Sequence, residues 1–208
     1  MNESKNNTHI ATLFNIIILI NIMIKKNMSE IIDQSEERKT LYYALGFTLA
    51  FFLYLLFVLS PNGKCFAVDV GSNSLGLTFS YTQEMVQGFF ELRTQEQLIC
   101  YGQFLQIWDV IFAIIYTLMY ATWIKYLFNK RRLLIIVPIL GMLADWSENF
   151  AEILMLKSYF ISNSISETLV SVGSGINSFK WVMSSLTYLI ILVGIIIAII
   201  AFIKRKLN

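Results

Sequence analysis

Four long hydrophobic runs, each bounded by charged residues, dominate the pattern of apolar and polar positions along the chain. A helix needs about 20 apolar residues to cross a bilayer core of about 30 Å, and each run reaches that length. The runs predict four membrane-spanning helices over residues 41–60, 104–128, 133–156 and 179–203. The first run contains no charged residue and is followed by Pro61-Asn62-Gly63, which predicts a turn.

A shorter apolar stretch over residues 10–24 is interrupted by Asn15 and Asn21. It is short for a span, and lysines rather than a small-residue cleavage site follow it. We interpret it as a peripheral segment, with a short span or signal anchor as the alternative. The chain then divides into an N-terminal segment over residues 1–40 with a charged linker, a four-helix transmembrane domain over residues 41–203, and a basic tail over residues 204–208.

Two loops are expected on one side of the predicted spans, over residues 61–103 and 157–178. In the longer loop, residues 63–77 are rich in Gly, Ser and Asn, which predicts turns. Ser80 and Thr94 each stand three positions before a glutamine, the spacing of a capping box. We expect a short amphipathic helix over about residues 82–92, and a second helix that begins near Thr94 and continues into the next span.

These elements predict an all-α integral membrane protein: a four-transmembrane-helix bundle with an amphipathic extramembrane helix and a peripheral N-terminal segment. Composition agrees, because 56% of the 208 residues are hydrophobic and only 14% are charged, against about 25% charged in average soluble domains. Such a composition excludes a soluble or disordered chain. The net charge of +2 is too small to indicate a nucleic-acid partner.

Basic residues near the predicted spans indicate the orientation of the bundle, because cytoplasmic loops carry an excess of Lys and Arg. Three basic clusters fall on one side of the four spans: Lys25, Lys26, Arg38 and Lys39; Lys125, Lys130, Arg131 and Arg132; Lys204, Arg205 and Lys206. Both ends of the four-helix bundle are therefore predicted to be cytoplasmic, and the two loops face the opposite side.

Several ionisable residues lie inside the predicted spans, where a charge costs about 2.5–3.5 kcal/mol. The second span carries Asp109 with Tyr116 seven positions later, and Lys180 lies at the start of the fourth. The third span carries a polar stripe at helical spacing, formed by Asp145, Glu148, Asn149 and Glu152. At about 1.5 Å per residue, these groups reach similar depths in the non-cytoplasmic half, with Glu152 near the interface.

Four acids against one nearby lysine indicate that a proton, a cation or water neutralises part of the charge. The candidate polar site comprises Asp109, Tyr116, Asp145, Glu148, Asn149 and Lys180. In it the acids supply charge, Asn149 orients them, Tyr116 donates a hydrogen bond, and Lys180 gates or neutralises the site. The alternative is a satisfied polar network that holds the helices in register.

Asp109 with Tyr116, the segment Asp145-Trp-Ser-Glu148-Asn149 and the pair Lys180-Trp181 resemble a family of small four-span membrane proteins, mostly bacterial and uncharacterised. The resemblance covers about residues 41–204, and the Asp-x-x-Glu-Asn motif in the third span is its most specific part. It implies the same fold and polar site and no particular activity. The chain departs from the family pattern at Phe112-Ala113, where a proline is usual, and around residues 96–98, where a Gly-Arg pair is expected.

Other chemistry is weakly represented. The only histidine, His9, lies outside the predicted bundle, so histidine-based catalysis and a histidine-ligated metal are not expected. A cofactor is unknown from the sequence, and no metal site is predicted. Cys65 and Cys100 both lie on the predicted non-cytoplasmic side, where they either form a disulfide or stay free, depending on the compartment.

The leading hypothesis is a multi-pass membrane protein whose acidic polar site binds a small cation, a proton or a polar lipid headgroup. One alternative is an intramembrane lipid-modifying enzyme that uses paired carboxylates as acid and base. A second alternative is a structural or partner-assembly subunit. A closed core in which every acid is paired would favour this last alternative. The lipid bilayer is the one partner that the sequence indicates directly.

Overall fold

The computed structural model describes residues 35–69, 74–129 and 131–207, and the regular secondary structure of these residues is helical. The chain divides into two units, Met1–Tyr42 and Tyr43–Asn208. In the described part of the first unit, residues 35–42 are helical and Lys39 Nζ lies 2.8 Å from Glu36 Oε1. The predicted peripheral segment over residues 10–24 lies outside the described residues.

In the described part of the chain, four helices are long and apolar enough to cross a membrane: Ser35–Phe66, Gln95–Leu127, Arg132–Ser162 and Glu167–Lys204. Each overlaps one of the four predicted spans and is longer than it. The prediction of an all-helical protein with four helices of spanning length is therefore confirmed. The additional length comes from polar ends that the hydrophobic runs did not include.

The first helix does not end at Pro61, so the predicted turn there is wrong. It continues through the π-helical segment η1 (Leu55–Leu59), α2 (Ser60–Gly63) and the 3-10 segment η2 (Lys64–Phe66). In η1 the Ser60 backbone N–H bonds the Leu55 carbonyl, five residues back. Pro61 stands in the first turn of α2, directly after η1, so its missing N–H falls where the backbone bonding changes from π-helical to α-helical, and the helix continues past it.

The two predicted helices between the first spans are both present. α3 (Gln83–Glu91) begins at Thr82, whose hydroxyl accepts from the Met85 N–H, so the predicted cap at Ser80 is wrong. α4 (Gln95–Gln103) begins with the predicted capping box of Thr94 and Gln97. It continues through the π-helical segment η4 (Phe104–Trp108) into α5 (Asp109–Leu127), which confirms one long helix into the second span.

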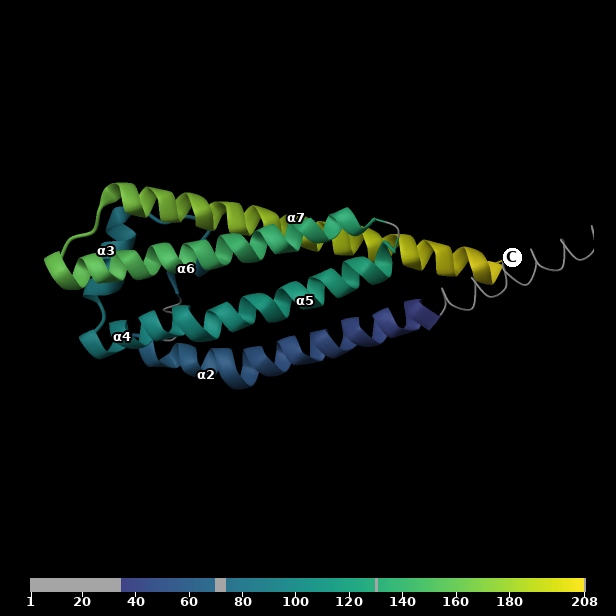
Figure 1. Ribbon diagram of the computed structural model, residues 1–208, viewed down its shortest axis with the longest axis horizontal. Helices are drawn as coiled ribbons and strands as arrows, with labels where there is room; N and C mark the ends of the chain where they lie inside the picture. The colour runs from purple at the N-terminus through teal and green to yellow at the C-terminus, as the bar shows by residue number, and fades with distance from the viewer. Residues whose placement is uncertain (1–34, 70–73, 130, 208) are drawn as a thin grey trace, which may run out of the picture. The chain divides into compact units, whose positions relative to one another are not determined.

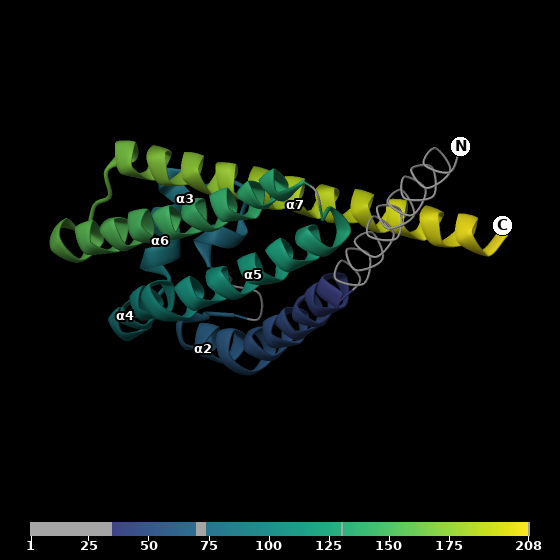
Figure 2. The same cartoon turned by 45° about the vertical axis from the view of Figure 1, so that its right-hand side comes forward.

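The last two helices form a hairpin in which the loop predicted over residues 157–178 is almost entirely helical. After the 3-10 segment η5 (Arg132–Ile135), α6 (Ile136–Ser162) runs to Asn163, whose left-handed backbone (φ 54°) ends the helix. α7 (Glu167–Leu207) starts four residues later and continues through the predicted basic tail. α6 and α7 lie side by side and antiparallel in both ribbon views (Figures 1 and 2).

At one end of the second unit, α3 and α4 pack against the α6–α7 hairpin (Figure 1), and we call this the α3–α4 end. The core there includes Val86 and Phe90 of α3, Tyr101 of α4, and Met155 of α6. The backbone before α3 is hydrogen-bonded to α7, because Asn177 Nδ2 donates to the Thr78 carbonyl at 2.7 Å. These contacts cover the polar residues of α6 with protein rather than solvent.

The opposite end contains the connection between α5 and α6, and we call it the α5–α6 end. The helices leading to it expose large apolar side chains: Leu49 of the first helix is more than half exposed, as are Leu192 and Ile197 of α7. Exposed apolar surface of this extent is typical of helices that contact lipid rather than water.

Candidate functional site

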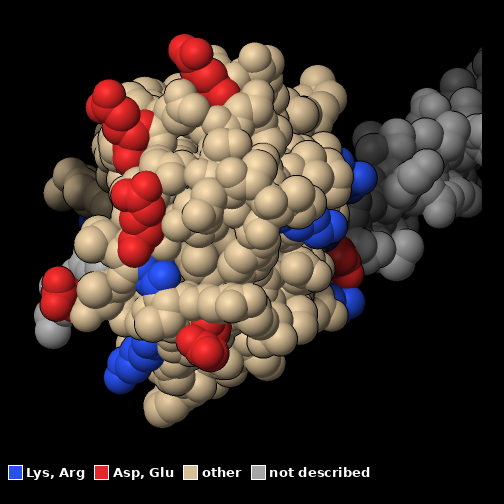
Figure 3. All heavy atoms as spheres, turned by 90° about the vertical axis from the view of Figure 1, so that its left-hand side faces the viewer, with Lys and Arg blue, Asp and Glu red and all other residues tan. Residues whose placement is uncertain are grey.

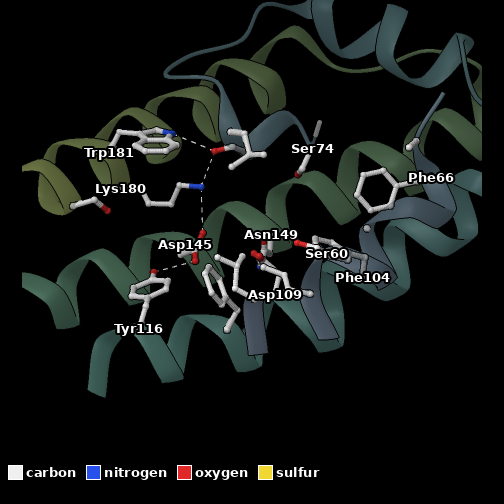
Figure 4. A pocket seen from close by; sticks show the side chains of 18 of the residues that line it. Ser60, Phe66, Ser74, Phe104, Asp109, Tyr116, Asp145, Asn149, Lys180 and Trp181 are labelled. Carbon is white, nitrogen blue, oxygen red and sulfur yellow. Dashed lines mark hydrogen bonds and ion pairs between the residues drawn. The ribbon is translucent and has the colours of Figure 1, made fainter. Parts of the chain in front are cut away.

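A cavity of about 940 Å³ lies among the first helix, α5, α6 and α7. Its volume is at the upper end of the range for small-molecule sites, about 300–1,000 Å³. Most of its lining is aliphatic or aromatic, and a few polar side chains lie together on one part of the wall (Figure 4). The lining side chains of the long helices include Phe51, Leu55, Leu59, Phe104, Asp109, Phe112, Tyr116, Tyr120, Asp145, Asn149, Lys180, Trp181, Ser184 and Tyr188.

Asp145 is the centre of the polar wall and has partners on two other helices. Lys180 Nζ of α7 lies 3.2 Å from Asp145 Oδ1, and the Tyr116 hydroxyl of α5 donates to Asp145 Oδ2 at 3.0 Å. Figure 4 shows the three side chains pointing toward one another. Both oxygens of this carboxylate are therefore paired, which offsets the cost of burying its charge.

Asp109 faces the same cavity with fewer partners. Asn149 Nδ2 donates to Asp109 Oδ2 at 2.8 Å and lies 3.3 Å from the Leu105 carbonyl. The Leu105 carbonyl is free to accept this bond because η4 is π-helical. In η4 the Asp109 N–H donates to the Phe104 carbonyl instead of the Leu105 carbonyl. Within the described residues Asp109 forms no ion pair. A carboxylate on a largely apolar wall is thus left with one hydrogen-bond donor.

Gly76 closes the cavity over Lys180. Its carbonyl accepts from Lys180 Nζ and from Trp181 Nε1, both at 3.1 Å. A Cβ at this position would lie 3.0 Å from Glu148 Oε1 and 3.2 Å from Lys180 Nζ, so only glycine allows this close approach without displacing the ion pair. The segment around η3 (Leu75–Leu77) is therefore fixed directly to the charged residues.

Glu148 and Glu152, which we call the buried carboxyl pair, lie on the side of Lys180 away from the cavity. Both side chains are fully buried, and neither lines the cavity. Glu148 forms an ion pair with Lys180, and Glu152 accepts a hydrogen bond from the Tyr101 hydroxyl. Glu152 is thus covered by protein, under α3, α4 and the extended α6–α7 hairpin, and its depth near the membrane interface stays a prediction.

Tyr81 completes the surroundings of the buried carboxyl pair. Its side chain is 4% exposed and its hydroxyl has no hydrogen-bond partner within the described residues. Burial, together with the nearby carboxylates of Glu152 and Glu148, raises the pKa of Tyr81, so the hydroxyl keeps its proton at neutral pH.

A disulfide bond between Cys65 and Cys100 joins η2 to α4, with the two Cα atoms 6.2 Å apart. Arg93 reinforces this connection: its Nε donates to the Phe66 carbonyl at 2.8 Å, and its guanidinium lies 3.4 Å above the centre of the Phe89 ring. Burial lowers the pKa of Arg93, which nevertheless remains charged at neutral pH. Together these bonds hold the backbone that borders the cavity.

Five of the six candidate site residues line the cavity: Asp109, Tyr116, Asp145, Asn149 and Lys180. The sixth, Glu148, contacts the cavity only through Lys180. Sequence reasoning did not include Gly76, Tyr101 or the site role of Trp181. Tyr101 carried a usable signal, because it lies in the predicted continuous helix two turns before Asp109 and on a similar face. No sequence pattern could have indicated Gly76, because its place at the site depends on how the loop folds onto α7.

The polar wall does not have the composition of a metal centre. Among the described residues, no group of three or more His, Cys, Asp or Glu side chains could hold a metal ion. What the wall offers is one paired and one nearly unpaired carboxylate, a lysine with three partners, and the phenol of Tyr116. No protein-family model, curated protein or solved structure matches the chain, so its function is proposed from this geometry alone.

Proposed function

We propose that the chain is a multi-pass membrane protein with its α5–α6 end in the cytoplasm. The α5–α6 end carries exposed Lys125, Arg131 and Arg132, and Lys204 and Lys206 follow the last apolar turns of α7. At the other end, seen face-on in Figure 3, acidic side chains accompany the few basic ones; the exposed acids there include Glu84, Glu91, Glu96 and Glu167. This distribution follows the positive-inside rule and makes α3 an extramembrane helix.

We further propose that the protein binds an amphipathic small molecule, with an apolar body in the cavity and a polar group at Asp109. The observation that carries this proposal is a large, mostly apolar cavity that has one carboxylate without a cation of its own. Lys180 is already engaged by Asp145, Glu148 and Gly76. Asp109 therefore favours a ligand group that donates hydrogen bonds, either an amine or hydroxyls.

The position of the cavity supports a ligand that comes from the bilayer. Its apolar walls come from helices of spanning length, with Phe51 and Leu55 on the first helix and Tyr188 on α7. A lipid with an amine or polyol headgroup would place its chain along these walls. A closed core with every acid paired would instead have favoured a purely structural subunit.

A matched pair of variants on α7 tests ligand binding. Ser184 lines the cavity, whereas its neighbour Ser185 is exposed and does not. Ser184→Phe should fill part of the cavity and reduce the amount of co-purifying lipid, measured by mass spectrometry of the purified protein. Ser185→Phe should leave it unchanged. Equal lipid profiles for wild type, Ser184→Phe and Asp109→Asn would contradict the proposal.

A lipid-modifying enzyme is the second candidate, and the unequal surroundings of Asp109 and Asp145 favour it. Two carboxyl groups that face one cavity with different partners can take the roles of acid and base. If this is the function, lipid added at a concentration that saturates both proteins should be chemically changed during incubation with wild type and unchanged with Asp109→Asn. Binding without conversion in both proteins would exclude it.

A further inference from the structure

Glu148 and Glu152 have no part in the proposed ligand site, yet they are the most deeply buried charges of the second unit. Both side chains are 0% exposed, and they lie one helical turn apart on α6. Glu148 Oε1 and Glu152 Oε1 receive no hydrogen bond from any donor in the described residues. A buried carboxylate oxygen without a donor is costly, so the structure requires a further hydrogen.

Because Glu148 and Glu152 stand four positions apart on α6, their side chains are neighbours on one face of the helix, each with a buried oxygen that no donor meets. A hydrogen bond between two carboxyl groups needs a proton on one of them, because two carboxylates are both acceptors. One proton shared by the two groups would supply the hydrogen that both oxygens lack. The titratable and charged groups that face the pair are Lys180 of α7, Asp145 of α6, Asp109 of α5, Tyr101 of α4 and Tyr81 before α3.

We propose that Glu148 and Glu152 form a proton-binding site that holds one proton between the two carboxyl groups. Hydrogen bonds connect this site in two directions. Lys180 links it to Asp145 and the cavity. The Tyr101 hydroxyl, which contacts Glu152 and lies 3.1 Å from Ser74 Oγ, links it to the segment before η3, where Ser74 also lines the cavity.

The site has a function if the cavity takes a cationic ligand, and this part of the inference rests on the proposed function. A cation that enters beside Asp109 brings positive charge close to Lys180. The shared proton then leaves the carboxyl pair for bulk water. One positive charge enters as one leaves, so the buried charge is unchanged, and ligand affinity rises with pH.

Infrared spectroscopy of the full-length protein tests the proton site directly. A protonated carboxyl group has a carbonyl stretching band that a carboxylate lacks. At neutral pH the wild type should show such a band that is lost in Glu152→Gln, because the remaining Glu148 is ionised against Lys180. Glu84→Gln, on the exposed surface of α3, is the matched control and should retain the band.

Tyr101→Phe keeps both carboxyl groups and removes only the donor to Glu152. It should retain the band at a shifted frequency, which keeps the test valid if Glu152→Gln does not fold. Identical spectra for wild type and Glu152→Gln, or an unshifted band in Tyr101→Phe, would overturn the proton site.

Dodecylamine, an amphiphile with a cationic headgroup, tests the coupling. Added to wild type in weak buffer with a pH indicator, it should release protons in proportion to the amine bound. Glu152→Gln should bind the amine without releasing protons. Binding to wild type without release overturns the coupling. If the amine does not bind wild type, the proposed ligand class is wrong, and the infrared result alone decides the proton site.

Discussion

At the α3–α4 end, charged and polar side chains are buried and bonded to several elements, whereas at the α5–α6 end the helices contact one another mainly through apolar and small residues. The ion pairs of Lys180 and the Cys65–Cys100 disulfide all belong to the first region. In the second region the described side-chain bonds between helices are few, for example Tyr120 to Tyr188 at 2.8 Å. The arrangement of the helices is thus set by polar bonds at the α3–α4 end and by apolar packing at the α5–α6 end.

The difference between the two ends has a physical basis in their surroundings, because the proposed topology places apolar helix surfaces in lipid and the α3–α4 end in water. Lipid can solvate the exposed Leu, Ile and Phe of the α5–α6 end, so few protein contacts are needed there. A buried carboxylate has no such solvent and needs hydrogen-bond donors from the protein or a bound proton. Substitutions at the α3–α4 end should therefore have the larger effects.

Removal of the lysine at the polar wall should have the largest effect. Lys180→Met leaves Asp145 and Glu148 buried without their cation, which costs about 3–5 kcal/mol when a buried pair is broken. Thermal unfolding followed by circular dichroism should show a large loss of stability. Lys157→Met, at an exposed position of α6, should change stability by less than about 0.5 kcal/mol.

A second substitution sharpens this result. Lys180→Met combined with Glu148→Gln removes one of the two uncompensated charges and should recover part of the lost stability. Equal losses in the single and double variants would show that Lys180 acts by packing and not by charge.

The disulfide should have the next largest effect. It joins residues separated by 35 positions, and cross-links over loops of this length contribute about 2–4 kcal/mol. Cys65→Ser or a reducing agent should lower the unfolding temperature of the wild type. Reductant should have no further effect on Cys65→Ser. Unchanged unfolding after reduction would mean that Arg93 and the core hold η2 without the bond.

The same two regions differ in how far they could be predicted from the sequence. Hydrophobic length and flanking charge are local properties, so they located all four long helices. Residues 157–178 have the polar composition of a loop, yet most of them are helical, and Val170 among them packs in one core with Met155 and the aromatic side chains of α3. That packing is tertiary information that one sequence does not contain.

The polar stripe of α6 shows the same limit at the site. Helical spacing placed four polar residues on one face of α6. In the structure this face divides into two pairs, and the two members of each pair are four residues apart. Asp145 and Asn149 line the cavity, whereas Glu148 and Glu152 lie under the α3–α4 end. The pairs differ by about 60° around the helix axis, an offset that matters only once the neighbouring elements are known.

Gly194 tests the claim that small residues set the packing at the α5–α6 end. A Cβ there would lie 2.7 Å from Phe128 Cε2 and 2.9 Å from Leu127 Cβ, an atom close to the backbone that cannot move away. Gly194→Ala should cost about 1–3 kcal/mol, measured by thermal unfolding. Gly175→Ala, on the same helix with nothing within 4 Å, should stabilise by about 0.5–1 kcal/mol. If both substitutions stabilise the protein, α5 and α7 can move apart at this end at little cost.

The smallest predicted effect concerns the start of α4, where the polar bonds of the α3–α4 end are exposed. The Thr94 hydroxyl accepts from the Gln97 N–H at 3.3 Å, and Gln97 Oε1 accepts from the Thr94 N–H at 3.0 Å. Thr94→Ala should cost about 1 kcal/mol and increase hydrogen exchange of the first amides of α4. Ser80→Ala should change neither quantity, because Thr82 caps α3. Faster exchange that is confined to α4, without loss of the disulfide-bonded core, would show that the bonds of this end act locally. Faster exchange that also extends into α5 would mean that the cap holds Asp109 in place as well.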